Sequence, residues 1–354
     1  MTSSLALVLF LVVLALAFDF LNGFHDAANS VATVVTTRVL SPPAAVFWAA
    51  LFNFVAAFCF GTGVAKTVSE KLIDPRAVNA YVVLGGLAGA IAWNLLTWWL
   101  SLPTSSSHAL ISGYAGAAIA KAGFGAVLLA GWAPVLLFLV LSPLVGLVLG
   151  WAIMTGISWL TYRLERHRAE RGFRHLQLVS AAAYSLCHGT NDAQKTMGII
   201  AALLVAGGHP EWTEGHFHTL IGQRSELAPW IVFCCNGAMA LGTMAGGWRV
   251  VKTMGSRITP NLRPVGGFSA ECAAAASIAL ATFAHTPIST THAIAGGIAG
   301  VGAARGARAV RWQWGQRIAW AWVLTFPGAA LIGALAYEVA HRAVEPFIPA
   351  LSTG

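Results

Sequence analysis

The sequence is poor in charged residues. Only 10% of its 354 residues are Asp, Glu, Lys or Arg, whereas a typical soluble domain carries about 25%. Hydrophobic residues make up 57% of the chain, and its mean hydropathy is +0.71. These values exclude an ordinary soluble protein. They predict an all-α polytopic membrane protein, because apolar segments of about 20 residues are long enough to span a bilayer.

Cysteine and metal-ligand motifs are also scarce. The five cysteines lie in apolar stretches with no ligand-like spacing; they are Cys59, Cys187, Cys234, Cys235 and Cys272. We expect them to be reduced residues of the protein core, and we expect no disulfide framework. The chain has no His-Glu-x-x-His or comparable ligand set. We therefore predict no enzyme, no catalytic residue, no resident metal and no cofactor.

Acidic residues are fewer than basic ones, 13 against 21, which gives a formal net charge of +8. The basic residues lie largely in short loops and form no patch interleaved with aromatic residues, so nucleic-acid binding is not expected. Basic loops instead orient membrane proteins, because they stay in the cytoplasm. Three segments are expected on that side: Arg163–His175, Arg249–Arg263 and Arg305–Arg317.

A motif of three adjacent hydroxyl residues occurs twice. Pro103–His108 reads Pro-Thr-Ser-Ser-Ser-His, and Pro287–His292 reads Pro-Ile-Ser-Thr-Thr-His. Proline is favoured at the first helical position, and the first backbone N–H groups of a helix have no intrahelical acceptor. With the positive end of the helix dipole they form an anion site. We therefore predict two helix starts, one from each half of the chain, that face one oxyanion.

A second motif, Gly-x-x-Asp, precedes each hydroxyl motif. Gly23–Asp26 corresponds to Gly189–Asp192. Asn53 and Asn236 then fall in corresponding apolar runs, where we expect them to brace broken helices. Paired halves with Gly- or Pro-interrupted segments in matching places indicate a transporter with a binding site near the membrane midplane.

The repeats divide the chain into a first half, 1–160, a basic cytoplasmic linker, 161–176, and a second half, 177–354. About ten transmembrane segments are predicted, with twelve as the alternative, and some helices are expected to be broken or re-entrant. Five segments per half would make the two halves inverted repeats. The segment Met1–Ala17 lacks the basic start of a signal peptide, so we expect a retained first helix.

Three acidic residues lie in otherwise apolar surroundings: Asp26, Asp192 and Glu271. A charged side chain at the membrane centre costs at least about 2.5–3.5 kcal/mol, so each needs a partner. Two carboxylates and an oxyanion cannot share a low-dielectric site without positive charge. The Asp motifs therefore predict a site for co-transported cations, which could be sodium ions, protons or a divalent metal. Carboxylate and amide oxygens are hard ligands that suit such ions.

Taken together, the motifs Gly23–Ser30, His188–Asp192, Pro103–His108 and Pro287–His292 resemble the duplicated signatures of the inorganic phosphate transporter (PiT) family. The resemblance covers nearly the whole chain. It implies a mostly helical, inverted-repeat and dimeric carrier that imports inorganic phosphate by cation symport, as a multi-pass protein of the cell inner membrane.

The resemblance also implies the roles of individual residues. Phosphate would be held by the hydroxyl motifs, at Ser105, Ser106, Ser107, Ser289, Thr290 and Thr291. The coupling cations would be held by Asp26, Asn29, Asn191 and Asp192.

Two positions depart from the sodium-coupled pattern of the family. His25 stands where the second half has Asn191, and Lys195 stands where the first half has Asn29. Histidine can carry a proton, and the Lys195 ammonium can replace one free cation. Both changes favour proton over sodium coupling and resemble the bacterial branch thought to carry neutral metal–phosphate complexes, with Mg²⁺ or Ca²⁺. Glu271 has no acidic equivalent in the first half, where the corresponding residue is Leu87. Glu271 is a further candidate for an ion or proton site.

The sequence leaves three alternatives open. Sulfate or another tetrahedral oxyanion is the alternative substrate, although a carboxylate can accept a hydrogen bond from phosphate that still carries a proton. A channel is the alternative to a carrier. His108 and His292 are either helix-stabilising side chains or proton carriers.

Overall fold

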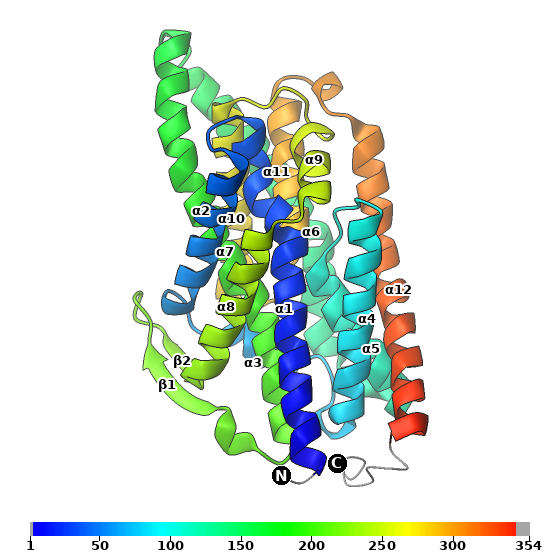
Figure 1. The fold of residues 1–354 in the computed structure, drawn as a ribbon. Coiled ribbons are helices and arrows are strands. Elements are labelled where there is room, and N and C mark those ends of the chain that lie inside the picture. The colour runs from blue at the N-terminus through cyan, green and yellow to red at the C-terminus, as the bar shows by residue number, and fades with distance from the viewer. Residues whose placement is uncertain (1–2, 345–354) are drawn as a thin grey trace.

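The computed structural model describes residues 3–344, so the outer ends of the two predicted halves, residues 1–2 and 345–354, lie outside the described residues. The described chain is almost entirely helical (Figure 1). The first half contains α1 (Ser3–Thr36), α2 (Pro42–Val55), η1 (Ala56–Phe58), α3 (Gly63–Glu70), η2 (Pro75–Ala77), α4 (Ala80–Trp99), α5 (Ser106–Ala122), η3 (Phe124–Ala126) and α6 (Leu129–Leu160).

The second half repeats this order and adds a small β-hairpin. It contains α7 (Arg166–Ala206), η4 (Pro210–Trp212), β1 (Glu214–His218), β2 (Arg224–Leu227), α8 (Pro229–Ala245), α9 (Trp248–Ser256), α10 (Pro264–Phe283), α11 (Thr290–Ala304), η5 (Ala307–Ala309) and α12 (Trp312–Val344). The strands β1 and β2 are antiparallel, and His218 is paired with Arg224.

The two halves run in opposite directions. In Figure 1, α1 rises from the end where the amino terminus lies, whereas its counterpart α7 descends toward that end. Likewise α6 rises and α12 descends. The predicted inverted repeat is therefore confirmed.

The halves also exchange their packing partners. Helix α1 packs on α8, and its counterpart α7 packs on α2; α5 packs on α12, and α11 packs on α6. Each partner comes from the other half of the chain. Neither half could bury its apolar surface alone in this arrangement.

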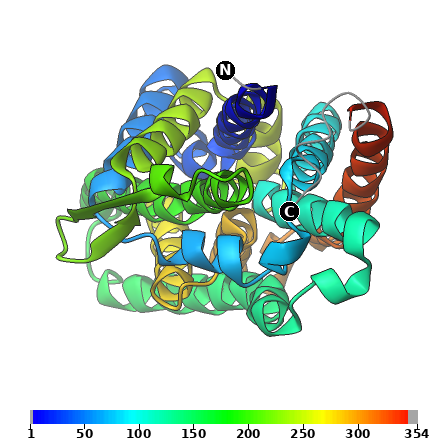
Figure 2. The same cartoon turned by 90° about the horizontal axis from the view of Figure 1, so that it is seen from below.

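All three basic segments lie at one end of the bundle, which we call the basic end; the β-hairpin lies near the other, which we call the hairpin end (Figure 1). Figure 2, seen from the hairpin end, shows the hairpin at the edge of the bundle. The first basic segment is not a loop along most of its length, because α7 begins at Arg166. Lys and Arg have good helix propensity, so a basic segment need not interrupt a helix.

Five helices of the described chain are long and apolar enough to cross a membrane: α1, α4, α6, α10 and α12. The bent pairs α2–α3 and α8–α9 raise the number to seven if each is one span. Helix α7 is not among them, although its 41 residues are long enough, because polar residues occupy its middle. The count of ten spans stays a prediction.

Two apolar clusters form the core, and the polar motifs lie between them. On α1, Val8–Phe18 contributes to the first cluster and Ala28–Val34 to the second. On α7 the order is reversed, with Tyr184 in the second cluster and Met197 in the first. The Asp motifs therefore lie in mid-helix, where the two clusters meet.

Candidate substrate and ion site

Both hydroxyl motifs begin helices, as predicted. Helix α5 starts at Ser106, and the Ser105 Oγ accepts a hydrogen bond from the His108 backbone N–H at 3.2 Å. Helix α11 starts at Thr290, and the Ser289 Oγ accepts from the His292 N–H, also at 3.2 Å. Ser105 and Ser289, the first residues of the triplets 105–107 and 289–291, therefore each cap a helix and satisfy one of its orphan N–H groups.

The prolines, however, are not at the first helical position that the motif suggested. Pro103 lies three residues before Ser106, and Pro287 lies three residues before Thr290. In each motif a serine stands directly before the first helical residue and is a strong N-cap. It adopts an extended backbone conformation, with φ of −94° at Ser105 and −90° at Ser289. The helix therefore begins only after the serine.

The Gly-x-x-Asp motifs lie within continuous helices, and their glycines permit close helix packing. A Cβ atom at Gly23 would lie 2.0 Å from the Met239 carbonyl oxygen of α8. A Cβ atom at Gly189 would lie 2.6 Å from the Asn53 carbonyl oxygen of α2. These glycines bring α1 and α7 against the broken helices of the opposite half, beside each Asp.

Within each half, one hydroxyl group donates to the aspartate of the same half. The Ser106 hydroxyl donates to Asp26 Oδ1 at 3.2 Å, and the Thr290 hydroxyl donates to Asp192 Oδ2 at 3.0 Å. Ser106 and Thr290 are equivalent in the repeat, as are Asp26 and Asp192. The structure thus joins each hydroxyl motif to its own Asp motif in the same way.

A second pair of equivalent contacts joins the two halves. The Asn29 amide donates to Thr291 Oγ1 at 2.8 Å. In the equivalent place, the Lys195 ammonium donates to Ser107 Oγ at 2.5 Å. The four hydrogen bonds form two pairs that are equivalent in the repeat, and they bring both hydroxyl motifs and both Asp motifs into a single cluster.

Lys195 makes two further contacts. Its ammonium pairs with Asp192 and donates to the Ile288 carbonyl oxygen at 2.6 Å. The Ser107 hydroxyl also donates to Asp192 Oδ1, at 3.2 Å. The buried ammonium therefore faces a carboxylate, a hydroxyl and a backbone carbonyl oxygen.

His25 and Asn191, which are also equivalent in the repeat, have different partners. The His25 Nδ1 lies 2.8 Å from Asp26 Oδ1. The Asn191 amide instead donates to Thr282 Oγ1 at 2.9 Å and accepts from the Ile288 backbone N–H at 3.2 Å. His25 thus adds a titratable group to its aspartate, whereas Asn191 fastens the connection before α11.

The cluster is sealed from solvent. The predicted residues of the two hydroxyl motifs and the two Asp motifs are each at most 4% exposed. In such a site electrostatic interactions are stronger than in water.

One residue of the site was not among those predicted. His188 is fully buried, and its Nε2 lies 3.2 Å from Asp192 Oδ2. Ligand atoms of Asp26, His188 and Asp192 all lie within 4.8 Å of one another, close enough to hold a metal ion. The signal in the sequence was the spacing of four residues between His188 and Asp192, which places both on one helix face.

Glu271 is not brought to this cluster. It accepts hydrogen bonds from Gln177 at 3.0 Å and Ser180 at 2.5 Å, both on α7. Ser180 precedes Asp192 by twelve residues, a rise of roughly 18 Å along the helix. Glu271 therefore lies toward the basic end, and its role as an ion or proton site stays a prediction.

Four other polar residues named in the sequence analysis, Asn53, Asn236, His108 and His292, make contacts within or between the helices around the site. The Asn53 amide donates to Thr243 Oγ1 at 3.0 Å, which joins α2 to α8 as expected for a brace. Asn236 donates within its own helix, to the Val232 carbonyl oxygen. His108 and His292 lie against each other, with ring centroids 4.9 Å apart.

Two inverted halves that bury paired helix starts and paired carboxylates at their junction define a membrane transporter of the inverted-repeat class. The model of the phosphate transporter family matches residues 22–333 of the chain. The chain therefore belongs to the phosphate transporter family.

Curated relatives agree with this assignment. The chain is 49% identical over 96% of its length to a probable low-affinity inorganic phosphate transporter of Rhizobium meliloti, of which it covers 98%. It is 44% identical over 95% of its length to a protein of the same name from Bacillus subtilis, of which it covers 97%.

A solved structure, that of the sodium-dependent phosphate transporter, has the same fold. The TM-score is 0.81, with 96% of this chain and 100% of the other chain covered. The sequence identity is 22%, so the similarity supports the architecture alone.

Proposed function

We propose that the protein imports inorganic phosphate across the cytoplasmic membrane by proton symport, with a divalent metal ion accompanying the phosphate. The basic end would face the cytoplasm, as the distribution of Lys and Arg predicts. The expected homodimer is retained as part of this proposal.

The contacts of the Lys195 ammonium carry the proposal. They are made with a carboxylate, a hydroxyl and a backbone carbonyl oxygen, which are the kinds of oxygen that bind hard cations. The equivalent position in the first half is the neutral Asn29. A tethered ammonium thus takes the place of one mobile cation, which lowers the need for sodium at Asp192.

The place for a transported proton is the pair His25 and Asp26, whose nearest side-chain atoms are 2.8 Å apart. Imidazole can accept a proton, and a protonated His25 would neutralise the charge of Asp26. A protonated imidazole is also a poor ligand for sodium.

The charge balance favours a metal ion in addition. Two aspartates and Lys195 leave one negative charge, and a phosphate dianion brings the total to three. A divalent ion held by Asp26, His188 and Asp192, together with one proton, cancels these charges. A neutral site avoids the high cost of a buried net charge when the loaded carrier reorients.

Uptake by purified protein in liposomes tests the coupling ion. We expect radiolabelled phosphate to accumulate under an inward proton gradient without sodium, and a sodium gradient alone to give no accumulation. Accumulation driven only by sodium would overturn the proposal. Excess sulfate should not compete with phosphate; competition by sulfate would restore the alternative substrate.

A double variant makes the first test sharper. His25→Asn with Lys195→Asn makes both Asp motifs alike, and we expect uptake to become sodium-stimulated and less dependent on the proton gradient. The matched control is His209→Asn, which replaces a histidine of the hairpin end outside the site. A double variant that keeps pure proton coupling would show that these two residues do not select the ion.

The accompanying metal is tested separately. Removal of divalent ions with a chelator should lower phosphate uptake by the wild type, and Mg²⁺ or Ca²⁺ should restore it. His188→Asn should weaken the metal dependence more than the phosphate affinity. Uptake that is unchanged by chelation would exclude a metal–phosphate complex as the substrate.

A further inference from the structure

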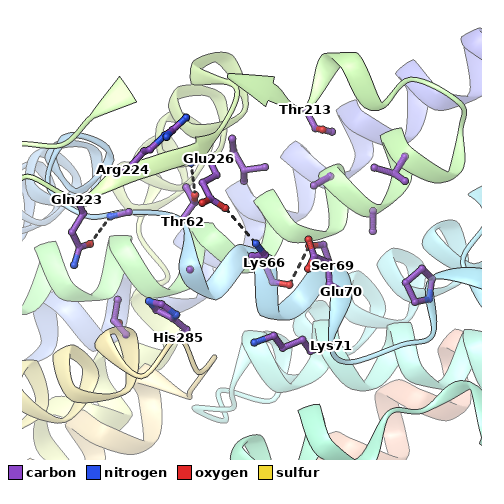
Figure 3. Close-up of a pocket in the computed structure, with 18 of the residues that line it drawn as sticks. Thr62, Lys66, Ser69, Glu70, Lys71, Thr213, Gln223, Arg224, Glu226 and His285 are labelled. Carbon is purple, nitrogen blue, oxygen red and sulfur yellow. Dashed lines mark hydrogen bonds and ion pairs between the residues drawn. The ribbon is translucent and has the colours of Figure 1, made fainter. Parts of the chain in front are cut away.

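A large pocket opens at the hairpin end, away from the buried cluster. Its volume is about 820 Å³. Its walls come from α3, the last turns of α7, the β-hairpin and the connection between α10 and α11 (Figure 3). This end lies opposite the three basic segments (Figure 1). With the basic end in the cytoplasm, the pocket faces the outside.

The lining of the pocket carries both charges but has a basic surplus. Lys66 and Glu226 form an ion pair at 3.4 Å (Figure 3). The other charged lining residues are the basic Lys71 and Arg224 and the acidic Glu70. His285 also lines the pocket. A cleft with a surplus of one sign raises the local concentration of counter-ions, which here are anions.

The pocket is separated from the buried cluster by a thin layer. Thr282 lines the pocket, and its Oγ1 accepts the 2.9 Å hydrogen bond from Asn191. The same Asn191 amide donates to the Thr286 carbonyl oxygen at 3.3 Å, and its own oxygen accepts from the Ile288 N–H. Asn191 adjoins Asp192, and the Ile288 carbonyl oxygen contacts Lys195. Asn191 therefore contacts the pocket wall on one side and adjoins the buried cluster on the other.

The connection between α10 and α11 is held from the pocket side as well. The Thr67 hydroxyl of α3 donates to the His285 carbonyl oxygen at 2.7 Å. His285 has a left-handed backbone, with φ of 54°, which is uncommon for a residue other than glycine. Its ring packs so closely on Gly63 that a Cβ atom there would lie 2.4 Å from it.

The start of α3 is held by a residue of α7 that lies close to the Asp motif. Gln194, two residues after Asp192, accepts from the Val64 N–H at 2.8 Å and donates to the Gly61 carbonyl oxygen at 2.8 Å. Gly61 and Gly63 also line the pocket. Movement of α7 at the Asp motif would therefore move the pocket wall.

We propose that this pocket is the outer entrance of the carrier, where inorganic phosphate binds before it reaches the hydroxyl motifs. The connection 284–288, held by Asn191 and Thr67, is the barrier between the two places. Opening requires that the Asn191 and Thr67 bonds break together, and closing reforms them behind the substrate.

Thiol labelling tests the entrance. In a background with the five native cysteines replaced and uptake retained, Ser69→Cys places a thiol on the pocket wall. A membrane-impermeant, anionic methanethiosulfonate applied from outside should label it and abolish uptake. Inorganic phosphate should slow the labelling, and sulfate at equal ionic strength should slow it less.

The matched control is Ser158→Cys, which lines a smaller cavity of about 280 Å³ at the basic end. It should resist the impermeant reagent from outside. Thr213→Cys, on the opposite wall of the entrance, serves as a second variant if Ser69→Cys does not fold. Absence of labelling at both positions, labelling without loss of uptake, or labelling that phosphate does not slow would overturn the proposal.

Reversing the sign of the surplus charge, from one positive to one negative, gives an independent measurement. The variant Lys71→Gln with Arg224→Gln should raise the KM for external phosphate about threefold to tenfold at low salt, with Vmax unchanged, and high salt should remove the difference. The matched control is Arg305→Gln with Arg308→Gln at the basic end. A KM that is the same as in the wild type at low salt, or a change that persists at high salt, would contradict an electrostatic entrance.

The inference rests on the proposed import of phosphate, but it does not depend on the coupling ion. Labelling reports access to the pocket even if uptake proves to be driven by sodium. Failure of proton coupling and failure of the entrance are therefore distinguishable.

Discussion

In the first half of the molecule, Asp26 lies beside His25 and close to the neutral Asn29. In the second half, Asp192 lies within reach of His188, Lys195 and hydroxyl groups from both helix starts. The scaffold around the two aspartates is otherwise alike, down to equivalent hydroxyl bonds and packing glycines. The repeat symmetry thus fixes the geometry around both aspartates, whereas the charge beside each one depends on a few side chains that differ between the halves, His25, His188 and Lys195.

The largest expected difference between the halves concerns the two aspartates. Asp26→Asn and Asp192→Asn should both abolish coupled uptake while the protein still inserts. Only Asp192→Asn leaves the Lys195 ammonium buried without its carboxylate, which should cost about 3–5 kcal/mol. Uptake in liposomes and the midpoint of thermal unfolding in detergent measure the two effects.

The control for this comparison is Asp192→Asn combined with Lys195→Asn, which should recover the thermal midpoint without recovering uptake. Wild-type uptake in either single variant would show that the coupling site is wrongly assigned. Equal thermal losses in the two single variants would refute the asymmetry.

The packing glycines should show a smaller asymmetry in stability. Gly23→Ala and Gly189→Ala each place a methyl group against a backbone carbonyl, which should destabilise the protein by about 1–3 kcal/mol. The loss should be greater at Gly23, where the contact is 2.0 Å against 2.6 Å at Gly189. Gly156→Ala, with no atom within 4 Å, is the control for thermal unfolding. A tolerated Gly23→Ala would argue against the close helix contact.

Substitutions in the hydroxyl motifs test the symmetry itself. Ser106→Ala and Thr290→Val each remove one hydroxyl that points at an aspartate, and each should weaken apparent phosphate affinity about tenfold with a smaller effect on Vmax. Thr290→Ser keeps the hydroxyl and should retain affinity. An effect confined to one of the two positions would show that phosphate is held mainly by one half.

The smallest effects are expected at the helix caps. Ser105→Ala and Ser289→Ala should each lower stability by about 1 kcal/mol, and glycine at the same positions by only a few tenths. Phosphate affinity should change less than in Ser106→Ala. A larger loss of affinity at the caps, measured by uptake at varied phosphate, would indicate that these serines bind the substrate directly.

Much of this site could be predicted from the sequence because short-range chemistry determines it. Three hydroxyls before an apolar run favour a helix start, and repeated acidic motifs in apolar surroundings need partners. The predicted position of the prolines at the first helical residue was wrong, because a strong serine cap outweighed the preference of proline for the first turn. His188 was missed as a site residue, since its role depends on which helix faces which.

The sequence by itself determined the class of protein, the inverted repeat and the residues that meet at its centre, because composition and periodic motifs reflect local physics. Only the tertiary structure decided that Lys195 bridges both halves and that Glu271 accepts from Ser180, about three turns before Asp192 on α7. It also decided that Asn191 lies between the cluster and the pocket at the hairpin end. These facts depend on the packing of helices from one half against helices from the other. Such contacts join residues far apart in the chain and leave no signal in the local sequence.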